Sequence, residues 1–536
     1  MMTKDIKHFI AAGLLCCGAA ALTACSDWDD HYVDAVSASG SGQTLWQTMQ
    51  QRPELSDFCE VLSQTKVYKH HAKTAVSYAD LLDGVQTFTV LAPVNGTFDK
   101  DSLLRLLTTN QGDSMVERSF VGNHLSYAIV SDAAVPTDFF LLNKKPMTLG
   151  QGKADNVSVK ESNVNAKGGL LHVLQNTLPY HYNLYEVMLS DPRYSFIGQQ
   201  LRSYEQDEFL PGQSVEGDMV DGEQLYVDSV FRERNILLER VGELAAEDSS
   251  YIFVVAQNDE WQRAWQEAMT YFHYSSAEET GDSLQRLYAN QALFTDAIFS
   301  RTIQSSPNDS LITYNYDKKY PQYHCFRKPF EPGGILYGAT ATDYSNGTLY
   351  TVPQWPFTPQ MTYQREIKIE GERTSLILKD SLCTATSRVL AADSVSEGGY
   401  LAILPQANSN WKITFRLDNV LSGAYDIMAI ILPEKVYDPT STIPASRIAA
   451  EINYVNEQGE DAVDNLGNAS FVTDPDRVDT IMLAENYRFP TTNYGLSEVR
   501  TSITLKTSVN GTQARRYTRR VYLDCIYLRP RTSKSE

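Results

Sequence analysis

The chain has 536 residues and a formal net charge of −20, with 66 acidic and 46 basic side chains. This acidic excess disfavours nucleic acids and anionic membrane surfaces as partners, because both are negatively charged. At about 150 residues per domain the length predicts three domains, and no segment beyond the first 24 residues is apolar and long enough to span a bilayer.

The first 24 residues have the pattern of a secretory signal. Lys4 and Lys7 form a short basic start, and an apolar run extends from Phe9 to Ala21. The residues that follow, LTAC ending at Cys25, resemble a lipoprotein signal, which implies that Cys25 is lipidated and becomes the mature N-terminus. The alternatives are an ordinary signal cleaved after Ala24 or a membrane span, but the apolar run is shorter than the roughly 20 residues that a span needs.

Residues 25–43 are predicted to form a lipidated tether. They begin with the acidic segment SDWDD, from Ser26 to Asp30, and end in small polar residues that are typical of a flexible linker. The acidic segment resembles the export signal of Bacteroidetes lipoproteins, which implies an outer-membrane protein exposed on the cell surface. A solvated acidic linker is the alternative.

Eight Asp-(Ser/Thr) pairs precede Leu, Met, Val or Ile, and they resemble the O-glycosylation acceptors of Bacteroidetes exported proteins. Ordinary residue frequencies would give roughly two or three such triplets. The excess supports an exported protein, with acceptor candidates at Ser102, Ser114, Ser229, Ser283, Ser310, Ser381, Ser394 and Thr480.

An internal repeat runs through the first two thirds of the chain. The segment TLWQTMQQRPELSDF, from Thr44 to Phe58, matches the segment from Asn183 to Phe196 at four positions with a constant offset. The stretch FTVLAPVNGTF, from Phe88 to Phe98, likewise aligns with Tyr251 to Trp261. In both copies we expect a buried strand, a polar turn and an amphipathic helix, closed later by a glycine turn and an alternating strand.

The first copy, residues 44–181, resembles a fasciclin (FAS1) domain. The sequence TFTVLAPVNGTF is similar to the first fasciclin box, NHLSY at Asn123 to Tyr127 stands at the His box, and GGLLHVLQNTLP matches the closing strand. The resemblance implies a β-sandwich or wedge with helices, and an adhesion surface at His124 and Tyr127. A structural, hydrogen-bonded role is the other interpretation of His124.

The second copy, residues 183–360, is a divergent version of the same pattern. Ala256 replaces the proline of the first box, Trp261 replaces Phe98, and no clear His box is present. The segment from Phe209 to Asp248 lengthens its middle. Any function carried by the fasciclin motif is therefore expected of the first copy rather than the second.

Residues 361–536 show alternating apolar and polar residues between Gly, Pro, Asn and Asp turns, which predicts an antiparallel β-sandwich. The segment FRLDNVLSGAYDI, from Phe415 to Ile427, resembles jelly-roll domains that follow fasciclin repeats in Bacteroidetes lipoproteins. Some such folds bind carbohydrate, but a fold does not transfer its ligand. The predicted fold class is thus a multidomain chain, α+β in the repeats and all-β at the C-terminus.

Motifs for catalysis or cofactor binding are missing from the sequence, which contains no HExxH, GxSxG, P-loop or GxGxxG. We expect no enzymatic activity and no cofactor. Cys59, Cys325, Cys383 and Cys525 lack CxxC spacing, so a zinc site is not expected. The sequence leaves open whether Cys383 and Cys525 pair or remain buried free thiols.

Two groups of residues in the C-terminal domain are candidates for binding. Asp474, Asp476 and Asp479 could offer oxygens to calcium, although a solvated turn is favoured and no metal is expected. Exposed aromatic rings stack on sugars, and the ring candidates are Trp411, Tyr425, Tyr437, Tyr487 and Tyr494.

Together these features predict a non-enzymatic surface-binding lipoprotein. It would act either in adhesion to cells or in glycan capture as an accessory to an outer-membrane uptake system. The first alternative is a structural subunit of a surface transporter complex, and the second is a hydrolase whose site lies in the C-terminal domain.

Overall fold

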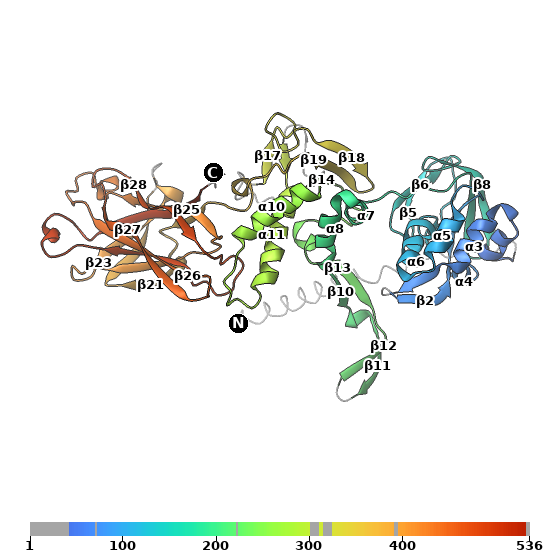
Figure 1. Cartoon of the computed structure of the whole chain (residues 1–536), viewed down its shortest axis with the longest axis horizontal. Helices are drawn as coiled ribbons and strands as arrows, with labels where there is room; N and C mark the ends of the chain where they lie inside the picture. The colour runs from blue at the N-terminus through green and yellow to red at the C-terminus, as the bar shows by residue number, and fades with distance from the viewer. Residues whose placement is uncertain are drawn as a thin grey trace, which may run out of the picture. The chain divides into compact units, whose positions relative to one another are not determined.

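A computed structural model describes residues 42–69, 72–220, 223–300, 310–314, 324–390 and 395–531. The signal segment, Cys25, the acidic segment that follows it, and Ser394 lie outside the described residues. The chain divides into two compact units, residues 1–181 and residues 182–536. Both consist mainly of β-sheets with some helices, as predicted (Figure 1). Among the described helices, none has the length and apolarity needed to cross a membrane.

The first unit is built around a seven-stranded sheet with the strand order β4-β3-β9-β8-β7-β6-β5. Its strands are β1 (Lys66–Lys69), β2 (Ala72–Ser77), β3 (Phe88–Pro93), β4 (Leu125–Ser126), β5 (Thr137–Phe140), β6 (Pro146–Gly150), β7 (Lys153–Ala154), β8 (Val157–Ala166) and β9 (Gly169–Leu174). Its helices are α2 (Leu45–Gln50), η1 (Pro53–Leu55), α3 (Ser56–Gln64), α4 (Tyr78–Leu82), α5 (Lys100–Leu106), α6 (Asn110–Val116) and η2 (Glu117–Val121).

Strand β3 is the buried centre of this unit, because its two faces pack into different cores. Phe88, Val90 and Ala92 join the core that the helices cover, whereas Leu91 joins a second core under β5, β6 and β9. Successive side chains of a strand point to opposite faces. A strand buried on both faces is therefore expected to be almost wholly apolar, and the one polar side chain of β3, Thr89, donates to the Ala128 carbonyl at 2.7 Å.

The second unit contains the second copy of the repeat, whose sheet has the order β15-β14-β19-β18. Its strands are β10 (Glu205–Phe209), β11 (Val215–Val220), β12 (Glu223–Asp228), β13 (Phe231–Asn235), β14 (Tyr251–Ala256), β15 (Ile298–Ser300), β16 (Ser310–Ile312), β17 (Cys325–Arg327), β18 (Thr340–Tyr344) and β19 (Gly347–Val352). Its helices are α7 (Leu184–Ser190), η3 (Pro192–Tyr194), α8 (Ser195–Arg202), η4 (Pro211–Gln213), α9 (Leu238–Val241), α10 (Asn258–Tyr271) and α11 (Gly281–Ala297).

The turn asparagine after the central strand fastens that turn to the start of a helix. In the first copy, Asn95 Nδ2 donates to the Pro53 carbonyl and to Ser56 Oγ, both at 2.9 Å. Its Oδ1 accepts from the backbone N–H of Asp57 at 3.0 Å. The side chain thus satisfies one of the backbone donors that the first turn of α3 leaves without a partner inside the helix.

The second copy repeats these three hydrogen bonds. Asn258 Nδ2 donates to the Pro192 carbonyl at 2.8 Å and to Ser195 Oγ at 3.1 Å, and its Oδ1 accepts from the N–H of Phe196 at 3.0 Å. The three partners of Asn258 are separated from those of Asn95 by the same constant offset that relates the two copies of the first repeated segment. The internal repeat is therefore present in the hydrogen bonds as well as in the sequence.

A glycine at the start of the closing strand is required in both copies. β9 runs parallel to β3 with Gly169 opposite Phe88, and β19 runs parallel to β14 with Gly347 opposite Tyr251. Both glycines have positive φ, 137° and 156°. A Cβ there would lie 1.8 Å from the Phe88 carbonyl oxygen and 2.1 Å from that of Tyr251, so no other residue fits.

The insertion in the second copy forms an arm of two short hairpins. β10 pairs with β13 and β11 pairs with β12, and the arm extends away from α8 (Figure 1). Three large apolar side chains on this arm are exposed: Val215, Met219 and Phe231.

The C-terminal residues form a sandwich of two antiparallel sheets. Five strands of one sheet have the order β22-β23-β30-β25-β28, with β20 also paired to β30, and the other sheet has the order β21-β24-β29-β26-β27. The strands are β20 (Ile367–Glu370), β21 (Ile377–Ser381), β22 (Cys383–Val389), β23 (Gly399–Pro405), β24 (Lys412–Arg416), β25 (Gly423–Leu432), β26 (Arg447–Val455), β27 (Asp461–Val472), β28 (Asp479–Phe489), β29 (Ser502–Thr507) and β30 (Val521–Pro530). Alternate residues of both sheets fill one core between them.

Candidate functional site: a cleft between the second repeat and the sandwich

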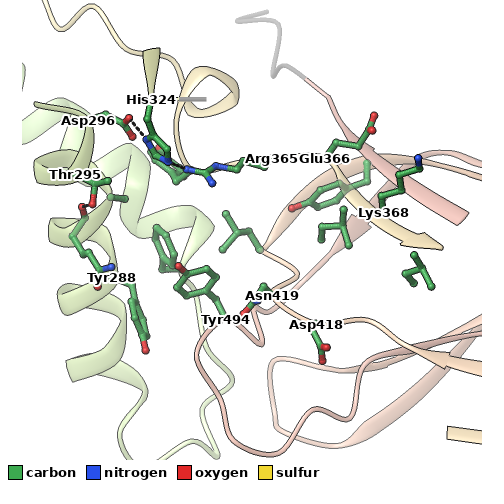
Figure 2. A pocket seen from close by; sticks show the side chains of 18 of the residues that line it. Tyr288, Thr295, Asp296, His324, Arg365, Glu366, Lys368, Asp418, Asn419 and Tyr494 are labelled. Carbon is green, nitrogen blue, oxygen red and sulfur yellow. Dashed lines mark hydrogen bonds and ion pairs between the residues drawn. The ribbon is translucent and has the colours of Figure 1, made fainter. Parts of the chain in front are cut away.

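A cleft of about 890 Å³ lies within the second unit, between helix α11 and the sandwich. Figure 2 shows its walls, with α11 on one side and the first strand and loops of the sandwich on the other. Ligand sites commonly have about 300–1,000 Å³ and commonly lie at domain boundaries. The lining side chains fall into three classes: aromatic rings, charged groups and small polar groups.

Aromatic rings form the inner wall of the cleft. Tyr494 meets Phe272 with ring centroids 5.4 Å apart and Tyr288 at 4.9 Å, both edge to face. Phe272 also contacts Tyr363 at 5.7 Å. Phe272 is buried and the three tyrosines are only partly buried, so the wall consists of aromatic rings of which the tyrosines are partly accessible.

One side-chain and one backbone hydrogen bond hold the Tyr494 loop against the second repeat. The Tyr274 hydroxyl donates to the Tyr494 carbonyl at 2.6 Å, and the Thr492 N–H donates to the His273 carbonyl at 2.7 Å. Gly495 has φ 71°, and a Cβ there would lie 2.2 Å from Tyr288 Oη. The cleft is thus shaped by a close fit between two domains.

A buried chain of polar groups forms the edge of the cleft next to α11. Arg365 donates an N–H to His324 Nε2, so the His324 proton lies on Nδ1 and is donated to Asp296 Oδ1 at 2.6 Å. Burial raises the pKa of Asp296, while the hydrogen bond from His324 opposes that shift. Because Arg365 occupies the free lone pair of the imidazole, His324 is not placed to act as a general base.

The opposite wall is a turn of the sandwich that Asn493 fixes. Asn493 Nδ2 donates to the Leu417 carbonyl at 2.7 Å, and its Oδ1 accepts from the Val420 N–H at 2.8 Å. This holds Asn419, which has φ 57° and is exposed, at the mouth of the cleft. Beside it, Arg416 Nε lies 2.7 Å from Asp418 Oδ1.

A buried acidic cluster lies on β20 and β30, next to the cleft residue Lys368. Among the described residues, Glu370, Asp524 and Cys525 are the group whose donor atoms, within 4.8 Å of one another, could hold a metal ion. The Lys368 ammonium lies 2.8 Å from Glu370 Oε1 and already places a positive charge there. Burial, together with the nearby Glu370, raises the pKa of Asp524 to about 6, while the hydrogen bond from the Ser396 N–H opposes that shift.

Two of the five predicted sugar-stacking rings are core residues, so their prediction was wrong. Trp411 is 0% exposed and its indole N–H donates to the Arg519 carbonyl, and Tyr425 is 1% exposed within the sandwich core. Each lies in phase with the inward-facing residues of its strand. Neither ring can stack on a ligand.

The other three predicted rings lie at different places. Tyr494 lines the cleft. Tyr437 is 39% exposed on the outer face of the six-stranded sheet, stacked on Tyr400, and its hydroxyl donates to Glu434 Oε1 at 3.0 Å. Tyr487 is partly buried and donates to Asp464. Of the five predicted rings, the structure therefore brings Tyr494 and Tyr425 to the cleft, but Tyr425 is 1% exposed and only Tyr494 is accessible there.

The predicted adhesion pair of the first unit is also corrected in part. His124 is fully buried, its Nδ1–H donates to the Phe120 carbonyl at 2.8 Å, and its Nε2 accepts from the Leu178 N–H at 3.1 Å. Burial lowers its pKa to about 4. His124 therefore cannot touch a partner, whereas Tyr127 is 54% exposed.

The weak calcium candidates close a turn with their own carboxylates. Asp474 Oδ1 accepts from the Asp476 N–H at 2.8 Å and Asp479 Oδ2 accepts from the Asp474 N–H at 3.0 Å. Asp474 also pairs with Arg477 and Asp476 with Lys435. These oxygens are engaged within the turn.

The remaining predictions concern side chains outside the cleft. Cys59, Cys325, Cys383 and Cys525 are free thiols, so Cys383 and Cys525 are not paired. The described acceptor candidates are exposed or partly buried: Ser102, Ser114, Ser229, Ser283, Ser310, Ser381 and Thr480.

The basic residues of the cleft were missed in the sequence. Arg240, Arg365, Lys368, Arg373 and Arg416 come from separate segments that carry no motif. The only available signal was the abrupt change near residue 363 from the repeat to the sandwich, because such boundaries often hold ligand sites.

None of the known protein-family models matches the chain. No curated protein is similar to it either. Among solved structures, a Paenibacillus xanthan lyase matches 36% of this chain and 17% of its own length, with 18% identity and a TM-score of 0.23.

Two further matches are the tandem CBM22 domain of Paenibacillus barcinonensis Xyn10C and an exo-β-1,3-galactanase of Phanerochaete chrysosporium. The first has 10% identity and a TM-score of 0.23, and covers 32% of this chain and 46% of that one. The second has 12% identity and a TM-score of 0.18, and covers 31% and 29%. The chain spans less than half the length of these three structures, and such scores establish no shared fold, so the conclusions below come from the geometry of the chain itself.

Proposed function

We propose that this chain is a lipid-anchored, surface-exposed protein with two FAS1-type repeats that captures a glycan in the cleft between the second repeat and the sandwich. The observation that carries the proposal is the cleft itself. Partly exposed tyrosine rings face charged and amide side chains there, and a sugar needs both a ring for its C–H face and polar partners for its hydroxyls.

Capture is favoured over adhesion through the fasciclin His box. His124, the side chain that the resemblance places at the adhesion surface, is fully buried. The cleft, in contrast, is open to solvent along exposed residues such as Asn419 and Arg373.

A binding role is favoured over hydrolysis for a physical reason. A glycosidase needs two carboxyl groups that reach the substrate. Each carboxylate lining the cleft is held by a nearby group: Asp296 by His324, Glu366 by Arg529 and Asp418 by Arg416. The buried carboxylates Glu370 and Asp524 are at most 3% exposed, so a substrate could not reach them.

The test is a glycan array probed with the chain lacking its first 25 residues. We expect specific binding that Tyr494→Ala abolishes and that Tyr437→Ala, which removes a ring outside the cleft, leaves intact. Unchanged thermal melting would show that the Tyr494→Ala variant is folded. Loss of binding on Tyr437→Ala alone, or no binding to any glycan together with co-purification of an outer-membrane transporter, would overturn the proposal in favour of another site or of a structural subunit.

Surface exposure is tested separately on whole cells. External protease should cleave the protein, and an antibody should label it without permeabilising the cells. Protection from both would contradict the interpretation of the acidic segment after Cys25.

A further inference from the structure

The cleft has a charge balance opposite to that of the whole chain. Overall, acidic side chains outnumber basic ones by 66 to 46. Among the side chains that line the cleft, five are cationic and three are anionic. The ion-pair partners outside the lining are Arg529, Glu370 and Glu397, so with them the cleft has six basic and five acidic side chains. This balance favours an anion more than the acidic remainder of the chain does, and the low-dielectric walls of a cleft strengthen the effect.

Each of the three acidic side chains in the cleft is paired within its own wall. Asp296 lies 2.6 Å from His324, Asp418 lies 2.7 Å from Arg416, and Glu366 lies 3.3 Å from Arg529. Arg416 and Arg529 offset part of the charge of Asp418 and Glu366, so these carboxylates repel an incoming anion less than solitary ones would. Burial disfavours the charged form of Asp296 and raises its pKa.

The basic side chains are held in position on both walls. On the side of the second repeat, Arg365 Nε donates to the Thr362 carbonyl at 2.9 Å, and Arg240 donates to Gln291 Oε1 at 3.2 Å. On the sandwich side, Lys368 lies 2.8 Å from Glu370 and Arg373 lies 3.0 Å from Glu397. Cations that are already positioned lose less conformational entropy when they bind.

We propose that the ligand of the cleft is an acidic oligosaccharide, with hexuronate residues whose carboxylates meet the arginine and lysine groups while a sugar face rests on Tyr288 or Tyr494. This inference rests on the proposed function and narrows it to one chemical class. Guanidinium groups form charge-assisted, often bidentate hydrogen bonds with carboxylates. Neither the rings alone nor the cations alone would select such a ligand.

The test is isothermal titration of the chain lacking its first 25 residues with an oligogalacturonate and with a neutral galacto-oligosaccharide of the same length. We expect the acidic ligand to bind at least about tenfold more tightly, since charge-assisted hydrogen bonds are stronger than neutral ones. The preference should shrink at high ionic strength, where exposed charges are screened.

Two variants test the walls separately, and a third is the control. Arg240→Gln and Arg373→Gln should each weaken oligogalacturonate binding by about tenfold and leave any binding of the neutral sugar unchanged. Arg263→Gln is the matched control, because Arg263 is an exposed arginine paired with one glutamate outside the cleft. It should change neither affinity.

The outcomes separate this inference from the proposed function. Tighter binding of the neutral sugar, or equal binding of both, would overturn the acidic ligand and leave glycan capture standing. No binding of either, with none on the array, would overturn both. Inorganic phosphate or sulfate that competes as strongly as the oligogalacturonate would show a simple anion site and would overturn the saccharide assignment.

Discussion

The burial of His124 in the first unit is explained by the hydrogen bonds of its ring. His124 links the end of η2 to the segment after β9, because one ring nitrogen donates to Phe120 and the other accepts from Leu178. Only the neutral imidazole, with its proton on Nδ1, can make both bonds. His124 therefore has a packing role in this chain, rather than a role at the surface.

His124 should make the first unit sensitive to acid. Its pKa is about 4 in the folded state against an ordinary value of 6.5. The unfolded chain therefore takes up a proton first, and stability that is complete above pH 6.5 is lost as the pH falls toward 4, by up to about 3 kcal/mol. Hydrogen exchange of peptides from the first unit, measured in wild type and His124→Gln, checks this.

The difference in stability between wild type and His124→Gln reports on His124 alone, because His172 and the other titrating groups are present in both. Wild type should be the more stable near neutral pH, and its advantage should shrink toward pH 4. An advantage that does not change with pH would contradict the neutral, buried state of His124.

The turn asparagines should contribute equally to the two copies. Asn95→Ala and Asn258→Ala each remove three hydrogen bonds and leave a backbone N–H at the start of a helix without its partner. We expect each to cost about 1–3 kcal/mol. Hydrogen exchange should show faster opening of α3 in the first variant and of α8 in the second. An effect in only one copy would contradict the equivalence.

At this scale, the sequence could have predicted more than it did. Trp411, directly before β24, is in phase with Ile413 and Phe415 of that strand, and this alternation already indicates an inward ring. Tyr425 is likewise in phase with Ile427. His124 differs, because its burial depends on the segment around Leu178, which no local pattern brings near.

Strands and their turns were the elements that the sequence predicted best. The run from Phe88 to Leu91 and the run from Tyr251 to Val254 both lie in central strands, and the alternating runs after Tyr363 form a sandwich. Alternation and glycine turns are local signals, so they can be recognised in a single sequence without an alignment. The arm of β10 to β13 appeared only as extra length, because its strands are short and polar.

Asp524 is predicted to weaken the sandwich at neutral pH. Its pKa is raised to about 6 on β30, so the folded state holds the proton more tightly than the unfolded chain does. Stability is therefore complete below pH 4 and is lost as the pH rises through 6, by up to about 3 kcal/mol. Asp524→Asn keeps the oxygen that accepts from the Ser396 N–H.

Asp524→Asn should have a higher free energy of unfolding than wild type at about pH 7.5 and the same free energy near pH 4. Urea unfolding at each pH measures this difference. Repeating the measurement with calcium tests the carboxylate group as a metal site. If wild type is more stable than Asp524→Asn at about pH 7.5 without added metal, the expected destabilisation by the ionised Asp524 is contradicted.

The junction loop is predicted to tolerate no side chain at Gly495. An added methyl group would have to displace Tyr288, because the Tyr288 hydroxyl would lie 2.2 Å from it. The positive φ of residue 495 would also be strained in alanine. Gly495→Ala should destabilise the second unit by about 1–3 kcal/mol and weaken glycan binding. Gly511→Ala is the control, since nothing would lie within 4 Å of a Cβ at that position.

Calorimetry of the two variants checks this. The control should melt within about 0.5 kcal/mol of wild type, because it is a surface change without lost contacts. Wild-type melting of Gly495→Ala would mean that the fit between Tyr288 and the sandwich does not stabilise the junction.

For the whole molecule, the second repeat and the sandwich act as one unit. Leu421 of the sandwich joins the core of the second repeat, and the Ser422 N–H donates to the Tyr271 carbonyl. The three-domain prediction did not include this union. A cleft built from both domains depends on tertiary contacts between distant segments, which explains why the sequence placed its candidate ligand-binding residues in the C-terminal domain alone.

The central claim is that a glycan binds between α11 and the sandwich, and hydrogen exchange with and without the glycan identified on the array tests it most directly. We predict protection of peptides that contain Tyr288, Asn419 and Tyr494, with no change in the first unit. Protection confined to the outer face around Tyr400 and Tyr437, or to the first unit near Tyr127, would contradict the claim.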